Sequence, residues 1–313
     1  MTHHTLKLAT RQSQLALTQS SWVARELARL NPGLTVELVN MITTGDQMSQ
    51  QPLPQIGGKG LFTKELEDAL LDGRANLAVH SLKDLPTVLP AGLVLAAVPP
   101  REDVRDVLIS RSGATLKKLP KGATVGTSSV RRSAQLRRAR PDLRIEPLRG
   151  NLDTRLRKLK EGLFDAIVLA AAGVRRLGWS GEITEYLNPE VVCPAVGQGA
   201  LGVEASSFDR TTLTALALLE DTHARLSVTA ERTLLQQLGG GCQIPIAACT
   251  TIEDTASPSM TLTAVVISPD GTQWIDSKER ANELSPEAAT DLGARCAAHL
   301  LSQGAAALLQ LSS

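Results

Sequence analysis

A strand–helix–strand pattern at the start of the chain constrains the fold most. Leu6-Lys7-Leu8 alternates as a half-buried strand does, and a helix that ends at Asn31-Pro32-Gly33 follows it. A second strand is predicted near Leu34-Thr35-Val36-Glu37-Leu38. Because β-α-β units build parallel sheets covered by helices, the pattern favours an α/β fold.

The same pattern starts again after a change of composition at Pro99-Pro100. Val107-Leu108-Ile109 is a predicted strand, and residues 123–129 form a strand and turn that lead into a helix from Val130. Ala166-Ile167-Val168-Leu169-Ala170 is a further buried strand. Two α/β units in tandem predict a cleft between two domains, which is a common place for a ligand.

From about residue 220 the pattern changes to that of a small α+β domain. Leu226, Ala230, Leu234 and Leu238 share one face of a long helix, and two alternating strands and an Ala/Leu-rich helix follow. Two or three domains are expected for 313 residues. We therefore predict an α/β domain of residues 1–99 with 200–219, a second α/β domain of residues 100–199, and an α+β domain of residues 220–313.

A lone cysteine stands where the long helix of the third domain stops. The stretch is Leu238-Gly239-Gly240-Gly241-Cys242-Gln243-Ile244-Pro245, in which three glycines free the backbone and Pro245 prevents a continued helix. A cysteine in this setting can meet a bulky group at close range. The alternative is a helix end followed by an ordinary buried cysteine, and these residues alone leave both interpretations open.

Composition excludes several classes of protein. The net charge of +1 gives the whole molecule no field for gathering polyanions. The four cysteines show neither C-x-x-C pairs nor zinc spacing, which fits a reducing compartment, and the five histidines fall at no metal-binding spacing. No apolar run approaches ~18 residues, and the N-terminus lacks a leader pattern. We expect a soluble cytoplasmic protein without a metal or a membrane span.

Polar residues follow two of the predicted strands. Lys83 and Asp84 come after Leu77-Ala78-Val79, and Thr127-Ser128-Ser129 lies at a strand-to-helix turn. Ligands of open α/β sheets bind at the carboxyl ends of strands, so both places are candidate sites. Lys83 and Asp84 as a surface ion pair, and the hydroxyls as a helix cap, remain the alternatives.

Arginines are crowded between residues 131 and 157, with few acids among them. Arg131 and Arg132, one turn into the helix that follows Ser129, would reinforce an anion site at its N-terminus. The following arginines are interpreted as a solvated helix face: Arg137, Arg138, Arg140 and Arg157.

Two glycine-rich stretches do not meet the requirements of phosphate loops. Gly57-Gly58-Lys59-Gly60, after the polar segment from Gln47 to Gln55, lacks P-loop spacing and is interpreted as a mobile lid candidate. Gly197-Gln198-Gly199-Ala200-Leu201-Gly202 matches G-x-G-x-x-G but leads into a strand at Leu201. We interpret it as a flexible return crossover between domains.

Several motifs together resemble the porphobilinogen deaminase family, whose members are also called hydroxymethylbilane synthases. The resemblance extends from Leu6 to about residue 250. The motifs are His80-Ser81-Leu82-Lys83-Asp84-Leu85-Pro86, Val125-Gly126-Thr127-Ser128-Ser129-Val130-Arg131-Arg132, Leu148-Arg149-Gly150-Asn151-Leu152-Asp153-Thr154-Arg155-Leu156, Pro194-Ala195-Val196-Gly197-Gln198-Gly199-Ala200 and Gly240-Gly241-Cys242-Gln243-Ile244-Pro245.

The resemblance implies three domains, of which the first two fold like periplasmic binding proteins. It implies a transferase of tetrapyrrole and haem biosynthesis that joins four porphobilinogen molecules head to tail with loss of ammonia. The product is the linear tetrapyrrole hydroxymethylbilane. By similarity, Cys242 carries a dipyrromethane cofactor through a thioether bond, and the enzyme is a cytoplasmic monomer.

The resemblance also assigns residues to roles. Asp84 is the implied catalytic carboxylate, which stabilises positive charge on a pyrrole ring. Arginine forks suit the acetate and propionate groups of the substrate because they bind carboxylates with two parallel hydrogen bonds. The implied cofactor-binding residues are Cys242, Lys83, Asp84, Ser129, Arg131 and Arg132. The implied substrate-binding residues are Arg11, Arg149, Arg155 and Arg176.

Two other classes of function compete with this transferase. A two-lobed small-anion solute-binding protein without catalysis explains a cleft and arginines, but it gives no role to Asp84 together with Cys242. A nucleic-acid-binding protein that uses Arg131 to Arg144 is disfavoured by the near-neutral charge and by an aromatic content of 2%.

Overall fold

The structure is a computed structural model that describes residues 4–47, 62–239 and 245–310. The chain forms two compact units. One comprises Met1–Glu102 and Ala200–Arg225, and the other comprises Asp103–Gly199 and Leu226–Ser313.

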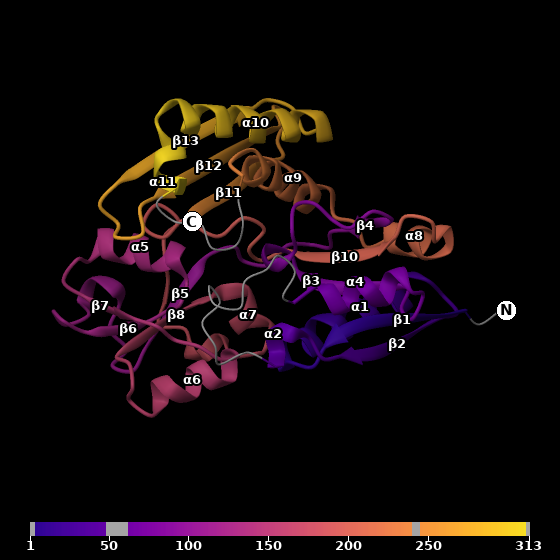
Figure 1. The fold of residues 1–313 in the computed structure, drawn as a ribbon, viewed down its shortest axis with the longest axis horizontal. Coiled ribbons are helices and arrows are strands. Elements are labelled where there is room, and N and C mark those ends of the chain that lie inside the picture. The colour runs from indigo at the N-terminus through magenta and orange to yellow at the C-terminus, as the bar shows by residue number, and fades with distance from the viewer. Residues whose placement is uncertain (1–3, 48–61, 240–244, 311–313) are drawn as a thin grey trace. The chain divides into compact units, whose positions relative to one another are not determined.

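The first unit is built on a five-stranded sheet in the order β2-β1-β3-β10-β4 (Figure 1). β1 is parallel to β2 and β3, whereas β10 runs antiparallel to β3 and β4. The strands are β1 (His4–Arg11), β2 (Leu34–Met41), β3 (Leu77–Ser81), β4 (Leu93–Ala97) and β10 (Leu201–Ser206).

Helices cover both faces of this sheet. Alternate residues such as Leu6 and Leu8 pack against α1 and α8, whereas Ala9 and Ala78 pack against α4. This alternation follows from the two-residue period of a strand, which sends successive side chains to opposite faces. The helical elements are α1 (Gln14–Leu30), α2 (Thr44–Gln47), α4 (Lys64–Leu71), η1 (Leu82–Asp84) and α8 (Arg210–Ala217).

The second unit contains a five-stranded sheet in the order β7-β6-β8-β5-β9. β6 is parallel to β7 and β8, and β5 runs antiparallel to β8 and β9, so the directions repeat those of the first sheet. The strands are β5 (Asp106–Ser110), β6 (Thr124–Gly126), β7 (Arg144–Glu146), β8 (Ala166–Ala170) and β9 (Glu185–Tyr186).

Helices again lie on both faces of the second sheet. Leu136 of α5 packs into the core on one face, and Leu156, Leu159 and Val174 of α6 and α7 pack on the other. The helical elements are α5 (Val130–Ala139), α6 (Leu152–Lys160), α7 (Ala171–Arg176), η2 (Leu116–Lys118) and η3 (Ser180–Glu182).

The same unit holds an antiparallel sheet of three strands, β11 (Ile246–Glu253), β12 (Ser259–Ile267) and β13 (Trp274–Ala281). One face packs against α9 (Thr222–Gln237), α10 (Pro286–Ser302) and α11 (Ala305–Gln310) (Figure 1). The other face meets Ala134 of α5. There a Cβ at Gly271 would lie 2.5 Å from the Ala134 carbonyl oxygen, so this turn requires glycine.

The predicted fold class is confirmed by these three sheets: two α/β sheets and a small α+β region. The strand Ala166–Ala170 has the predicted bounds, and Leu226, Ala230, Leu234 and Leu238 are all buried on one helix face. Leu201 begins β10, so the rejection of a dinucleotide motif is confirmed. The division into three domains at the predicted boundaries stays a prediction, and the lid candidate Gly57-Gly58-Lys59-Gly60 lies outside the described residues.

Candidate functional site

Three strands of the first sheet end at one edge. β1, β2 and β3 are parallel, so their carboxyl ends lie together, as in other open α/β sheets where ligands bind. Arg11 is the last residue of β1, and Lys83 and Asp84 form a 3₁₀ turn directly after β3. The structure therefore brings these three predicted site residues to the same edge of one sheet.

Buried leucines anchor the turn that carries Asp84. Asp84 is exposed, while Leu82 and Leu85 on either side of it are buried. The amide of Leu82 donates to the carbonyl of Ala200 at 3.0 Å. A Cβ at Gly202 would lie 2.7 Å from the Leu82 side chain, so the glycine makes room for this anchor. An exposed carboxylate on an anchored turn is well placed to meet a cationic ligand group.

Arg11 is half-buried and its guanidinium lies over the ring of Phe62, 4.2 Å from the centroid. Stacking on an aromatic face orients a guanidinium without using its in-plane N–H donors. The contact with Phe62 therefore fixes the orientation of the Arg11 guanidinium at the end of β1.

A buried acidic cluster lies on the α4 face of the same sheet. The Nε2 atom of His80 in β3 is 3.0 Å from Oε2 of Glu204 in β10, and both side chains are buried. Glu67 of α4 is also buried, and burial raises its pKa above 4.5, with the negative charge of Glu204 adding to the shift. Two buried carboxyl groups here face a single imidazole, and sequence reasoning did not single out either acid.

The second sheet repeats the edge arrangement with arginines. β6, β7 and β8 are parallel, and the segment after each strand carries predicted site residues: Ser129 after β6, Arg149 after β7 and Arg176 at the end of the helix after β8. Ser129 follows β6 as the N-cap of α5 and accepts from the Arg132 amide at 3.4 Å, so the capping interpretation is confirmed. Its role as a cofactor ligand stays a prediction.

Arg131 and Arg132 are buried and share one carboxylate. Asp106, the first residue of β5, is 2.8 Å from Nη2 of Arg131 and 2.7 Å from Nη2 of Arg132. Arg132 also donates through Nε to Asp106 at 3.1 Å. Burial by itself would raise the pKa of Asp106, but the two guanidiniums outweigh it and hold the pKa below its ordinary value. Sequence reasoning missed Asp106, because nothing in the chain's local pattern links it to residues 25 positions later.

Arg149, Arg155 and Arg176 lie at the same edge of the second sheet. Arg149 precedes α6, and Arg155 on that helix donates through Nε to the Gly150 carbonyl at 2.7 Å. Arg176 ends α7, which follows β8, and donates to the Gly199 carbonyl at 2.7 Å. All three side chains are half-buried, as expected for arginines that reach a ligand from a fixed backbone.

Arg137 and Arg138 of α5 are exposed, as expected of a solvated face, whereas Arg140 after the helix is half-buried. Arg137 donates to the Pro269 carbonyl at 2.9 Å, and Arg138 stacks over Trp274. Arg140 binds both oxygens of Asp142 and the carbonyl of Leu116. Arg137 and Arg138 have these contacts because α5 packs beside the three-stranded sheet, whereas Arg140 is held by residues of its own α/β region. Arg157, which is exposed and paired with Glu161, fits the expectation.

The glycine-rich segment before β10 is the expected crossover, because the chain returns to the first unit at Ala200, and it forms a hydrogen-bonded turn. Gln198 is buried and donates to the Val104 carbonyl at 2.8 Å and to Asp106 at 2.9 Å. The amide of Gly197 donates to Glu231 at 2.8 Å. Gly197 and Gly199 have φ of 70° and 88°, which explains the spacing of the two glycines.

Cys242 lies outside the described residues. The three described cysteines, Cys193, Cys249 and Cys296, are buried and form no disulfide with one another. Burial raises the pKa of the Cys193 thiol above its ordinary range and that of Cys296 to about 11. A thiol must ionise to act as a nucleophile, so Cys193 and Cys296 are poorly suited to carry a covalent group.

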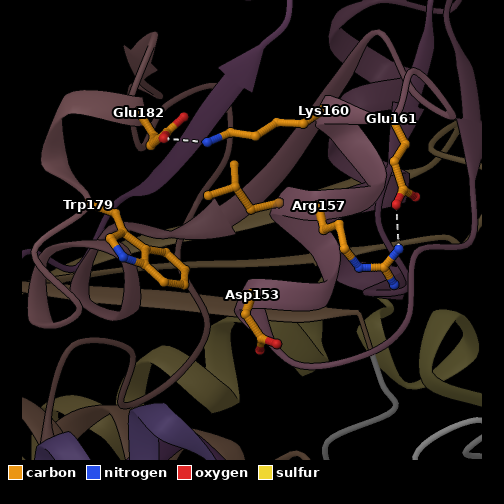
Figure 2. A pocket seen from close by; sticks show the side chains of 7 residues that line it. Asp153, Arg157, Lys160, Glu161, Trp179 and Glu182 are labelled. Atoms are coloured by element: carbon orange, nitrogen blue, oxygen red, sulfur yellow. Dashed lines mark hydrogen bonds and ion pairs between the residues drawn. The ribbon is translucent and has the colours of Figure 1, made fainter.

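A surface hollow of about 530 Å³ lies between α6 and η3. Figure 2 shows Trp179 facing the helix, with Lys160 paired to Glu182 at 2.7 Å and Arg157 paired to Glu161 at 2.5 Å. These charges neutralise each other, and none of the predicted site residues lines the hollow. In the part of the chain that the structure describes, there is no cluster of metal-ligating side chains and no helix able to cross a membrane.

The structure is thus that of an α/β protein whose strand ends carry arginines, a lysine and one exposed carboxylate. Family models refine this class. "Porphobilinogen deaminase, dipyromethane cofactor binding domain" matches residues 6–214, and "Porphobilinogen deaminase, C-terminal domain" matches residues 225–302. The chain belongs to the porphobilinogen deaminase family.

Relatives of this name match almost the whole chain. Porphobilinogen deaminase of Brevibacillus brevis is 50% identical over 303 residues, which cover 97% of this chain and 96% of that protein. The Bacillus subtilis protein is 45% identical over 306 residues, covering 97% and 95%. The chain therefore spans nearly the full length of these relatives.

Solved structures with a related shape are more distant. The periplasmic VFT2 domain of Bordetella pertussis BvgS aligns with a TM-score of 0.39 and 18% identity, covering 69% of this chain and 86% of that chain. A TRAP periplasmic solute binding protein from Desulfovibrio salexigens aligns with a TM-score of 0.43 and 12% identity, covering 71% and 74%. Scores this low carry no argument about the function of this chain.

The residues present fit a dipyrromethane group, whose acetate and propionate side chains are anions. Arg131 and Arg132 carry two positive charges and Asp106 one negative charge, so the three groups together keep one positive charge. This surplus lies at the N-terminal end of the ten-residue helix α5, whose dipole also favours an anion. The donor set therefore suits carboxylates.

Proposed function

We propose that the chain is a hydroxymethylbilane synthase, a transferase that joins four porphobilinogen molecules into a linear tetrapyrrole. The observation that carries the proposal is 50% identity over 97% of the chain to a protein named porphobilinogen deaminase. The strand-end placement of Asp84 and the arginines supports it, because these residues supply one carboxylate for the reacting ring and several cations for its acid side chains.

We propose Cys242 as the point where the dipyrromethane cofactor is attached through a thioether. When bound, that group supplies the primer on which the chain of pyrroles grows. The burial of Cys193 and Cys296, with the raised pKa values of their thiols, supports the choice of Cys242.

Asp84 is the proposed catalytic residue. Its exposed carboxylate accepts hydrogen bonds from pyrrole N–H groups and stabilises positive charge on a ring while ammonia leaves and while a proton is lost. A charge pair ~4 Å apart is worth about 4 kcal/mol at an effective dielectric constant of ~20. The buried Leu82 and Leu85 fix the turn, so the carboxylate is held in place before substrate binds.

The cationic residues bind and orient the anions. Lys83, Ser129, Arg131 and Arg132 are proposed to hold the carboxylates of the cofactor. The proposed substrate and chain ligands are Arg11, Arg149, Arg155 and Arg176. Their half-burial supports this role, because a guanidinium shielded from water binds a carboxylate more strongly than one at full exposure.

We further propose that the enzyme works in the cytoplasm as a monomer, in three domains with the predicted boundaries, and without nucleic acid or membrane. Three free cysteines and a net charge of +1 support this setting. Size-exclusion chromatography with light scattering checks the state of assembly: a mass of about one chain is expected, and twice that mass contradicts it.

The intact mass of the denatured protein tests the proposed function, with Cys242→Ser as the control. An excess of two linked pyrrole units in the wild-type chain, absent from Cys242→Ser, is the expected result. If the preparation carries a bare mass, addition of porphobilinogen is expected to restore the excess. A wild-type chain that binds porphobilinogen and never gains mass would leave the solute-binding alternative in its place.

A further inference from the structure

Asp106 occupies an unexpected position for an acid in an anion-binding protein. Its side chain is fully buried at the start of β5, between the guanidiniums of Arg131 and Arg132. An acid beside an anion site repels the anion, so a simple charge argument predicts that Asp106 weakens binding. Its position therefore calls for another role.

The contacts of the two arginines show what Asp106 does. Its Oδ2 forms an ion pair with Nη2 of Arg131 at 2.8 Å, and its Oδ1 accepts hydrogen bonds from Arg132, so each oxygen holds one guanidinium. Backbone carbonyls complete the arrangement, with Cys193 accepting from Arg131 at 2.5 Å and Val168 from Arg132 at 3.3 Å. Both guanidiniums are thereby held in position by groups of the protein itself.

Donors remain on both guanidiniums after these contacts. A guanidinium has five N–H donors. Among the described residues, the named contacts use Nη1 and Nη2 of Arg131, and Nε, Nη1 and Nη2 of Arg132. One positive charge also remains, since one carboxylate faces two cations. A bound carboxylate can satisfy both the remaining charge and the remaining donors.

Gln198 ties this cluster to the chain segment before β10. Its amide donates to the same Oδ1 of Asp106 at 2.9 Å and to the Val104 carbonyl at 2.8 Å. Gln198 is fully buried, so Asp106 is itself held from a second direction. Because the Asp106 carboxylate is itself held in place, it can fix the positions of the Arg131 and Arg132 guanidiniums.

We propose that Asp106 is a positioning residue for capture of the cofactor: it fixes the Arg131 and Arg132 guanidiniums so that they bind the carboxylates of the dipyrromethane. The inference rests on the proposed function and adds a residue that touches neither substrate nor cofactor. A simple charge argument predicts that removal of Asp106 speeds the loading of the cofactor, whereas this inference predicts that it slows loading. Removal of this negative charge slows the loading of an anionic group.

The test measures loading of the apo chain with porphobilinogen by intact mass over time. Asp106→Asn is expected to acquire the two-pyrrole excess at less than about a tenth of the wild-type rate. Asp106→Glu, which restores the charge, is expected to load faster than Asp106→Asn. Asp142→Asn is the matched control, because it breaks a similar two-contact pair with Arg140 at the far end of α5 and is expected to load as wild type.

A folding defect is separated from a loading defect by circular dichroism and by a milder variant. Gln198→Met removes the hydrogen bond to Asp106 without a change of charge, and its loading is expected to slow about three- to tenfold with the fold retained. If either variant, Asp106→Asn or Gln198→Met, is folded and loads at the wild-type rate or faster, the positioning role of Asp106 is overturned while the proposed function stands. A wild-type chain that gains no mass overturns the proposed function and this inference with it.

Discussion

The two five-stranded sheets have the same strand order and directions, yet their buried charges are balanced in different ways. β10 of the first sheet and β5 of the second occupy the corresponding antiparallel position, and each contributes a fully buried acid. Glu204 of β10 faces His80 and a second acid, Glu67. Asp106 of β5 faces two arginines.

The difference separates the tasks of the two sheets. Arginine is charged at every ordinary pH, so the Asp106 cluster keeps a permanent surplus of positive charge. The Glu204 cluster contains two carboxyl groups and one imidazole, and burial raises the pKa of Glu67, so this cluster has no permanent surplus of positive charge. This surplus supports the proposed role of the second sheet in holding anions, and the first sheet presents the proposed catalytic carboxylate, Asp84, on an exposed turn.

The largest expected effect is on the exposed turn of the first sheet. Asp84→Asn keeps the shape of the side chain and removes its charge, so we expect turnover of porphobilinogen to fall about 10²–10³-fold while the fold is retained. Asp72→Asn, an exposed acid of the same unit, is the control. Near-normal turnover in Asp84→Asn would contradict the proposed catalytic role of Asp84 and, with it, the proposed division of tasks between the two sheets.

The Asp106 cluster is expected to show the next largest effect, on stability. Asp106→Asn leaves two buried guanidiniums with a weaker partner, a change that typically costs about 3–5 kcal/mol. Because its pKa is lowered in the fold, the stability from Asp106 is present above its ordinary value of 3.8 and is lost as the pH falls below that value. Chemical denaturation at pH 7 and pH 3.5 measures both effects, and a variant with the wild-type acid response would contradict them.

A smaller effect is expected at the edge of the second sheet. Arg149→Ala removes a charged hydrogen-bond donor, which is worth about 1.5–3 kcal/mol, so elongation is expected to stall with short pyrrole chains bound. Native mass spectrometry during turnover detects these species. Arg157→Ala, on the exposed face of α6, is expected to release product at the normal rate, and the same behaviour in Arg149→Ala would refute its role.

The smallest effect is expected at Glu67. Its raised pKa means that the folded state holds a proton more strongly than the unfolded chain, so its contribution to stability is lost as the pH rises above 4.5. Gln does not ionise, so Glu67→Gln avoids this loss of stability. We expect it to raise the free energy of unfolding at pH 8 by about 1 kcal/mol or less. Thermal unfolding at pH 5 and pH 8 checks the sign, with Asp68→Asn as control. A stabilisation greater at pH 5 than at pH 8 would contradict the account.

Sequence reasoning was most successful where hydrophobic periodicity is clean. Ala166–Ala170 is a buried apolar run that begins directly after Asp165, and its bounds were predicted correctly. β7, Arg144–Glu146, was missed because three residues with two exposed charges give no periodic pattern. Short strands of this kind form because a neighbouring strand pairs with them, which local sequence does not reveal.

The candidate site divides in a similar way. The sequence placed Asp84 and Ser129 at strand ends, because a strand followed by a polar turn is a local feature. Asp106 and Glu204 were missed because the residues they contact are distant in sequence. An acid within a strand pattern is ordinarily interpreted as a residue on the solvent-exposed face. In both cases a lone acid beside an apolar run, as in Asp106-Val107-Leu108-Ile109, was the available signal.

The most direct test of the central claim is the stoichiometry of the reaction. Purified protein with its cofactor loaded is incubated with porphobilinogen, and released ammonia and tetrapyrrole product are both quantified. The account predicts porphobilinogen consumption with four ammonia molecules released for each linear tetrapyrrole. Binding of porphobilinogen with neither ammonia nor product would contradict it and would identify the chain as a binding protein without catalysis.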